Sequence, residues 1–328
     1  MIITRTPFRV SFCGGGSDLP AFYQKHGGCV VSAGIQKYMY LSVHPAFDPE
    51  TVVLKYSQTE IVRNVEEIKH RYYKEIIKKF GTAGVELVST ADIPAGTGLG
   101  SSSSFTVGLL HALYSYTGKY VSKERLAEEA CRVELEDLGE PIGKQDQYAA
   151  AFGGLNFYSF NSDGSVFVEP VIMRAESYEK LEDNLLLFYT GGVHSASDIL
   201  REQGKNVTQG EKEENQLRMC GLARDLRGYL QKNETEMLGE ILDESWQLKR
   251  TLAGGISSPA IDEYYETARK NGAAGGKLLG AGGGGFLLLY ADGKNQGRLR
   301  RALPLQEIQF SLDRQGSSVI YVGQKTER

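Results

Sequence analysis

Between residues 94 and 104 the sequence reads Pro-Ala-Gly-Thr-Gly-Leu-Gly-Ser-Ser-Ser-Ser, a bend rich in glycine and hydroxyl groups. Gly96, Gly98 and Gly100 stand at alternate positions, where glycine lets the backbone take positive φ and approach another group closely. Alternating apolar residues just before the bend indicate a short strand. After it, apolar residues at spacings of three and four across residues 105–116 predict an amphipathic helix. The bend therefore joins a strand to the N-terminus of a helix.

This order points unpaired backbone N–H groups, and the positive end of the helix dipole, at whatever occupies the bend. A polyphosphate is the ligand that matches both features. The alternative is a flexible linker that happens to precede a helix, since glycine and serine runs are common in linkers. Linkers are rarely placed between a buried strand and a strongly periodic helix, so we expect an anion site.

Composition sets the limits of the other interpretations. With 328 residues, 41% of them hydrophobic and 24% charged, the chain is an ordinary globular protein of two domains or one large one. A formal charge of −4 argues against nucleic acid or an anionic membrane as the partner. The four scattered cysteines and the absence of a signal-peptide core predict reduced thiols in the cytoplasm.

A cluster of turn-forming residues at 161–166 suggests a domain boundary, which divides the chain into residues 1–162 and 163–328. Ahead of it we expect strands at about 2–12, 28–44, 51–57 and 155–160, and helices at about 65–80, after Ser122 and after a loop at 139–143. Beyond it we expect a strand at 185–189, helices at about 211–231, 235–252 and 260–271, and a glycine-dense segment, 272–285, before a strand at 286–290.

Within that segment, residues 280–285 match the dinucleotide pattern G-x-G-x-x-G. The context does not fit, because that fingerprint follows a strand and opens a helix, whereas here a helical pattern lies upstream and a strand follows directly. Two interpretations stay open: a tight turn packed against another segment, or a wall of the phosphate site.

Four ionisable residues are candidates for chemistry. Glu134 lies in the middle of an apolar helix face, where a carboxylate needs a cation or several donors, and Mg²⁺ is a natural partner. The alternative is a glutamate whose side chain reaches water. Asp146 has the simpler interpretation of a helix N-cap, Arg9 of the solvent face of an edge strand, and Asp18 of a turn former.

Three separated motifs together resemble those of the GHMP family of small-molecule kinases. They are the N-terminal strand and turn at residues 7–18, the bend at 94–102, and the glycine-rich segment at 277–286. The resemblance runs essentially from end to end. Within the family, the chain most resembles the sugar 1-kinases that act on D-glycero-D-manno-heptose 7-phosphate. The shared features are the Gly-Gly-Gly-Ser-Asp-Leu-Pro turn and the segments 143–154 and 244–285.

The resemblance implies an α+β fold in two domains, an N-terminal α/β sandwich-like domain and a C-terminal ferredoxin-like domain, with ATP and sugar meeting in the cleft between them. It implies ATP and Mg²⁺ as cofactors, Asp146 as the base and Arg9 as its paired cation. The ATP phosphates would be held by Gly96, Thr97, Gly98, Leu99, Gly100, Ser101, Ser102 and Ser103, the metal by Ser102 and Glu134, and the sugar by Gly16, Ser17, Asp18, Gly282 and Gly283.

The expected activity is transfer of the γ-phosphoryl group of ATP to the anomeric hydroxyl of the heptose phosphate, in a route to nucleotide sugars for surface polysaccharide. The alternatives are an L-fucose or other hexose 1-kinase, and a non-catalytic sugar or nucleotide sensor on the same fold. Galactose is disfavoured, because Gly15 and Gly16 replace the Glu-His of galactokinases. His194 stands where close relatives tend to have arginine. Lys144, Lys249 and Arg250 are guesses for a subsite that binds the distal phosphate.

Overall fold

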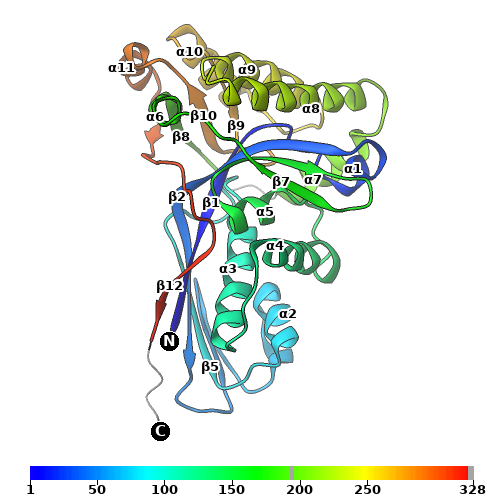
Figure 1. Ribbon diagram of the computed structural model, residues 1–328, viewed down its shortest axis with the longest axis vertical. Helices are drawn as coiled ribbons and strands as arrows, with labels where there is room; N and C mark the ends of the chain where they lie inside the picture. Colours follow the sequence, from blue (N-terminus) through cyan, green and yellow to red (C-terminus); the bar gives the residue numbers. More distant parts are fainter. Residues whose placement is uncertain (193–195, 324–328) are drawn as a thin grey trace.

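Two long antiparallel strands, β1 (Ile2–Cys13) and β2 (Gly28–Pro45), are the frame of the first sheet (Figure 1). The computed structural model describes residues 1–192 and 196–323. Strand β2 is long enough to pair with two strands along its other edge, β6 (Leu155–Phe160) near its start and β5 (Val85–Ala91) near its end. The other strands of this sheet are β3 (Val52–Lys55), β4 (Thr59–Val62), β7 (Val166–Pro170) and β12 (Ser318–Val322).

Strand β1 changes register against β2 between Pro7 and Phe8. Proline has no N–H to donate to the ladder, which is why it is found at such irregularities. Phe8 and the apolar residues that alternate with it after the shift are fully buried, as the pattern predicts. The opposite face of the strand is also covered, since Arg9 is only 5% exposed. Arg9 therefore does not lie on a solvent face.

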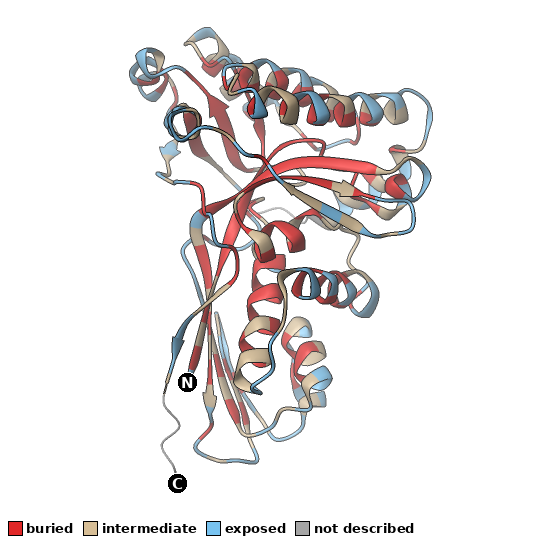
Figure 2. Cartoon of the chain, viewed as in Figure 1, coloured by how far each residue is buried: buried red, intermediate tan, exposed pale blue. Residues whose placement is uncertain are grey.

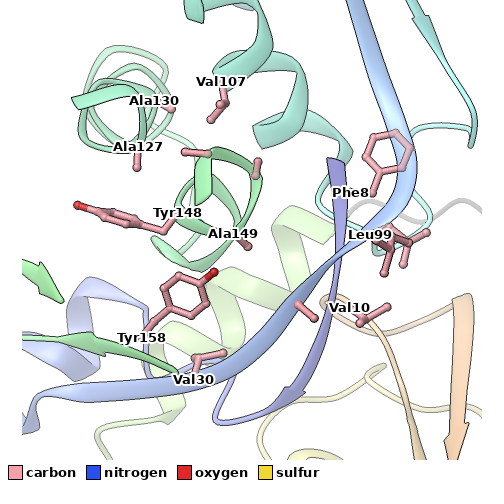
Figure 3. Packing of buried hydrophobic residues seen from close by; sticks show 14 of the residues in the cluster. Phe8, Val10, Val30, Leu99, Val107, Ala127, Ala130, Tyr148, Ala149 and Tyr158 are labelled. Atoms are coloured by element: carbon pink, nitrogen blue, oxygen red, sulfur yellow. The ribbon is translucent and has the colours of Figure 1, made fainter. Parts of the chain in front are cut away.

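Helices cover one face of the first sheet, and their apolar sides pack against β1 and β2 (Figures 2 and 3). The helix predicted after the bend is α3 (Ser101–Tyr116), and the helix predicted after Ser122 is α4, whose first turn Ser122 caps. The predicted helix at 65–80 is shorter than expected, because a 3-10 turn (Val65–Glu67) precedes it. The helices here are α1 (Pro20–His26), α2 (Arg71–Phe80), α3, α4 (Lys123–Cys131) and α5 (Gln145–Phe152), with a π-helical turn at Arg132–Asp137.

The second sheet has four antiparallel strands in the order β11-β8-β10-β9, and the helices α8, α9, α10 and α11 lie with it in Figure 1. Along the chain, helices connect β8 to β9 and β10 to β11. This connectivity and strand order are the split βαβ arrangement of ferredoxin-like folds. Its strands are β8 (Leu185–Gly191), β9 (Gly275–Leu278), β10 (Gly285–Tyr290) and β11 (Gln306–Glu307), and the helices of this part are α6 (Ala175–Asp183), α7 (Ala196–Asn206), α8 (Gly210–Gln231), α9 (Met237–Lys249), α10 (Pro259–Lys270) and α11 (Gly293–Ala302).

The two-part α+β architecture is confirmed, but the turn taken as the boundary has another role. Residues 161–165 connect β6 and β7, which are antiparallel neighbours in the first sheet. The change of sheet falls later, between Pro170 and Leu185. Strand β12 then returns to pair with β1. Turn residues mark a hairpin as readily as a linker, because both need the same backbone conformations. Among the described helices, none is long and apolar enough to span a bilayer.

The segment that returns to the first sheet is anchored to α3 through His111. The Nδ1 atom of His111 lies 2.9 Å from the Oγ atom of Ser317, which lies 2.9 Å from the Oγ1 atom of Thr6 in β1. Burial and the nearby charge of Lys123 lower the pKa of His111 to about 4. The folded protein therefore keeps this imidazole neutral at pH values where an unfolded chain would protonate it.

We expect His111→Gln to weaken the acid dependence of stability. Between pH 6.5 and about 4 the unfolded wild-type chain binds a proton at His111 that the folded chain does not, so the wild type loses stability as pH falls through this window. The contribution is about 3 kcal/mol at most, because each pKa unit corresponds to about 1.4 kcal/mol. Urea unfolding across this pH range measures it, and parallel profiles for the two proteins would contradict it.

Candidate active site

The glycine bend lies at the N-terminus of α3 with its amides free. Gly96, Gly98 and Gly100 have φ values of 77°, 84° and 74°, in the left-handed region that side chains disfavour. Within the described chain, no protein acceptor is recorded for the backbone N–H groups of residues 96–102. These donors and the N-terminus of α3 together form an arrangement that suits an anion.

The second glycine segment packs directly against the bend. A Cβ on Gly98 would lie 2.6 Å from the carbonyl oxygen of Leu279, and one on Gly280 would lie 2.5 Å from the Cα of Gly98. A Cβ on Gly285 would lie 2.3 Å from the carbonyl oxygen of Thr97. Residues 280–284 are the turn between β9 and β10, so a strand precedes them where the sequence suggested a helix. The segment is a closely packed turn, and four of its residues line the cavity; a role in binding phosphate stays a prediction.

The carboxylate of Asp146 lies beside the bend and is held by Arg9. The Nε and Nη2 atoms of Arg9 donate to its two oxygens, each at 2.8 Å, and Nη1 donates to the carbonyl of Gly98 at 2.6 Å. A Cβ on Gly100 would lie 3.3 Å from Oδ2 of Asp146. Asp146 stands in the first turn of α5, whose cap position is Lys144, so it is not the N-cap. Its side chain faces the site.

Asp18 occupies the same region as a buried acceptor. Its Oδ1 accepts from the N–H of Gly16 at 2.9 Å, and its Oδ2 accepts from the N–H of Gln145 at 3.2 Å. A Cβ on Gly143 would lie 1.9 Å from that Oδ2, so only glycine leaves room for the carboxylate. Burial, together with the negative charge of Asp146, raises the pKa of Asp18.

The other residues expected at the site contribute mainly backbone. The side chain of Thr97 donates to the carbonyl of Pro94, and the hydroxyl of Ser17 bonds both backbone groups of Cys29. Leu99 is buried and its carbonyl accepts from the N–H of Arg9. Ser101 and Gly282 line the cavity, and the N–H of Gly283 donates to the carbonyl of Ile256.

Glu134 is fully buried in the π-helical turn, as the apolar face around it predicts. Its Oε2 accepts from the hydroxyl of Ser103 at 2.7 Å and from the Nε2 atom of Gln147 at 2.5 Å. Its Oε1 accepts from the hydroxyl of Thr106 at 2.8 Å. Ser103 and Thr106, rather than Ser102, are therefore the hydroxyl residues in contact with this carboxylate.

A magnesium ion fits this set of donors. A carboxylate has about four lone-pair positions, and three of those on Glu134 are used, which leaves one on Oε1. No described lysine or arginine pairs with Glu134, and burial raises its pKa to about 7. Ser102 lines the cavity one residue from Ser103. Hydroxyl and carboxylate oxygens are ligands that Mg²⁺ prefers, and its charge would compensate the buried carboxylate.

Arg9, Asp18, Asp146, Ser102 and the glycines of the bend line one cavity of about 860 Å³, whereas Glu134 is not among its lining residues. Its lining includes aromatic side chains of α2, α3 and the β3–β4 region. It also includes Asp18, Asp146, Gln203 and two lysines, Lys249 and Lys277. The aromatic residues are Tyr56, His70, Tyr72 and Phe105.

Sequence reasoning missed most of these cavity residues. Gln203 comes from α7, which the periodicity did not predict, and a Cβ on Gly16 would lie 2.3 Å from its Nε2 atom. Lys277 belongs to the third motif, and its position beside the glycine-rich turn was the only available signal. The aromatic residues form ordinary apolar patterns, which do not distinguish a ligand site from a core.

Of the three residues suggested for a distal phosphate subsite, one lines the cavity and two do not. Lys249 lines the cavity, whereas Lys144 donates to the carbonyl of Gly164, and Arg250 pairs with Asp262 at 3.1 Å. Neither Lys144 nor Arg250 lines the cavity. The histidine singled out at position 194 lies outside the described residues.

Comparison with known proteins agrees with this geometry. Residues 59–154 match the family model of the GHMP kinases N terminal domain, and residues 226–307 match that of GHMP kinases C terminal. A D-glycero-alpha-D-manno-heptose 7-phosphate kinase of Campylobacter jejuni is 30% identical over 319 residues, which are 92% of this chain and 93% of that protein.

Solved structures show the same fold. A structure described as a D-glycero-D-manno-heptose 1-phosphate kinase from Bacteroides thetaiotaomicron superposes with a TM-score of 0.81 at 23% identity, over 99% of this chain and 100% of that one. The galactokinase of Lactococcus lactis gives a TM-score of 0.77 at 18% identity, over 97% of this chain and 94% of that one. Two family models and a relative similar along nearly its whole length establish that this chain belongs to the GHMP kinase family.

Proposed function

We propose that the protein is an ATP-dependent sugar kinase that transfers the γ-phosphoryl group to the anomeric hydroxyl of D-glycero-D-manno-heptose 7-phosphate. The observation that carries the proposal is the Arg9–Asp146 pair beside the free amides of the bend, around one cavity. The heptose phosphate is supported by the relative of Campylobacter jejuni, which is similar over 93% of its length.

Asp146 acts as the base that accepts the proton of the sugar hydroxyl. Two parallel hydrogen bonds from Arg9 fix the orientation of the carboxylate, and a positioned base of this kind speeds proton transfer in the transition state. The third contact of Arg9, to the carbonyl of Gly98, fixes the base relative to the bend. The distance between base and phosphate is therefore set by one side chain.

The bend stabilises the phosphates. In phosphoryl transfer the negative charge spreads over the oxygens of a loose transition state, and preorganised N–H donors and a helix N-terminus stabilise that charge. The amides of residues 96–102 and the start of α3 supply both. A magnesium ion held by Ser102 and Glu134 would neutralise further charge on the phosphates.

We propose that the acceptor sugar binds beside Asp18. Gly16 and Gly282 also line the cavity, and Ser17 and Gly283 hold their turns by hydrogen bonds to the carbonyls of Cys29 and Ile256. Gln203 covers Gly16, in the space where a larger residue at position 16 would otherwise lie. Because the reaction consumes ATP, we assign it to the cytoplasm.

The second candidate is an L-fucose or other hexose 1-kinase. The bifunctional fucokinase/GDP-fucose pyrophosphorylase of Arabidopsis thaliana is 27% identical over 90% of this chain, which covers 30% of that protein. A panel of heptose 7-phosphate, heptose, L-fucose and galactose, each with ATP and Mg²⁺, decides between them. Preference for the phosphorylated heptose supports the proposal. Preference for an unphosphorylated hexose supports the second candidate, and binding without turnover indicates a sensor.

We expect Asp146→Asn to lower kcat by roughly 10²- to 10⁴-fold, the usual effect of losing a general base. The amide keeps the shape of the carboxylate but does not accept the proton. Steady-state kinetics measure the effect, with Asp225→Asn, an exposed change on α8, as the matched control. A kcat close to that of the wild type would show that Asp146 is not the base.

We expect Glu134→Gln to raise the Mg²⁺ concentration needed for half-maximal rate by about tenfold or more. This is the loss of affinity expected when one contact to a charged group is removed. The matched control is Glu129→Gln, a buried carboxylate on α4 that is already paired with Lys79 and Arg125. That control should lower stability without changing the metal titration. An unchanged titration for Glu134→Gln would remove this residue from the metal site.

A further inference from the structure

Two lysines are buried in the wall of the cavity. Lys249 is the last residue of α9 and is 6% exposed, and Lys277 lies in β9 and is 1% exposed. Both line the cavity that contains Arg9 and Asp146. Lysine is rarely buried unless its charge is paired, so two such residues on one cavity need an explanation.

Within residues 1–192 and 196–323, each ammonium group has only a neutral hydrogen-bond acceptor. The Nζ atom of Lys249 donates to the carbonyl of Gly280, and that of Lys277 donates to the carbonyl of Phe12 at 3.2 Å. No carboxylate of the described chain forms an ion pair with either residue. Most other charge contacts in this protein are ion pairs on the surface, such as Lys55 with Glu86.

The environment of Lys249 and Lys277 favours binding of a negatively charged ligand. Burial lowers the pKa of both lysines. For Lys249 the positive charges of Lys277 and Arg9 lower the pKa further, and the negative charges of Asp18 and Asp146 offset part of this effect. Neither Asp18 nor Asp146 forms an ion pair with either lysine, and both oxygens of Asp146 already accept from Arg9. A buried charge without a partner is costly, and an anion entering the cavity would remove that cost.

The position of the pair identifies the kind of anion. Lys249 holds Gly280, which packs on Gly98 of the bend, and Lys277 holds the strand that carries Arg9. The two ammonium groups therefore belong to the part of the cavity where acceptor and nucleotide meet. Ammonium groups are common ligands of phosphate, and a phosphoryl group carries about two negative charges.

We propose that Lys249 and Lys277 form a binding site for a phosphoryl dianion, an inference that rests on the proposed sugar kinase function. In that reaction two molecules carry such a group: the acceptor, with its own phosphate, and ATP, with its γ-phosphate. The site binds one of these two groups, and Arg9 remains committed to Asp146.

The test uses Lys249→Met and Lys277→Met, which keep an apolar stem and remove the charge. Arg250→Met is the matched control, since it removes a cation one residue from Lys249 that pairs with Asp262 outside the cavity. For each protein we would measure kcat/KM with heptose 7-phosphate and with unphosphorylated heptose. Calorimetric titrations with heptose 7-phosphate, ADP and a non-hydrolysable ATP analogue complete the set.

If the acceptor phosphate occupies the site, kcat/KM for heptose 7-phosphate falls by roughly 10- to 150-fold, the loss expected for one hydrogen bond to a charged group. The value for unphosphorylated heptose then stays at the wild-type level. If the γ-phosphate occupies the site, both acceptors lose equally, and affinity for the ATP analogue falls while affinity for ADP is unchanged. Either result supports the proposal.

The proposal is overturned if both lysine variants match Arg250→Met in every measurement. The calorimetric titrations need no turnover, so they test the lysine site even if the wild type proves not to be a heptose kinase. If Lys249→Met fails to fold, Lys277→Met and the charge-preserving Lys249→Arg carry the test. Lys249→Arg is expected to retain most of the affinity for the phosphoryl group that Lys249→Met loses.

Discussion

The guanidinium of Arg9 connects three segments that are far apart in the sequence. It reaches from β1 to the carbonyl of Gly98 in the bend and to both oxygens of Asp146 at the start of α5, while its backbone N–H bonds the carbonyl of Leu99. The pair is largely shielded from water, with 6% of the Arg9 side chain and 27% of the Asp146 side chain exposed. Such a pair contributes little to stability once desolvation is included. Its value is in geometry, because it fixes an acid relative to an array of amides.

Close backbone packing makes that geometry rigid. The bend at Gly98 and the turn at Gly280 approach so closely that neither position has room for a methyl group. The turn of the second sheet therefore contacts the glycine bend of the first part directly, through peptide groups rather than through flexible side chains. Glu134 adds a second fixed point, since it ties α3 to α5 by hydrogen bonds from Thr106 and Gln147.

The sequence predicts this site unevenly, for physical reasons. The helix after the bend and the burial of Glu134 follow from local periodicity, which the structure obeys. The boundary at 161–166 could not be placed, because a hairpin and a linker use the same turn residues. From the residues alone, Asp146 was interpreted as a helix N-cap. Its partner Arg9 lies in a distant strand that only the tertiary fold brings close. Lys277 was missed for the same reason.

The pairing of β12 with β1 has a consequence for how the protein is made. Residues Ile2 to Arg5 pair with residues 318–322, so this edge of the strand that carries Arg9 cannot be covered until residue 322 has left the ribosome. During translation that edge presents unpaired backbone groups, which are a template for association with other chains. Closing so large a loop is also slow, because distant segments must meet before their contacts stabilise the sheet. Protection of β1 by a chaperone during synthesis would therefore matter more to this enzyme than to a protein whose first strand pairs only with its sequence neighbours.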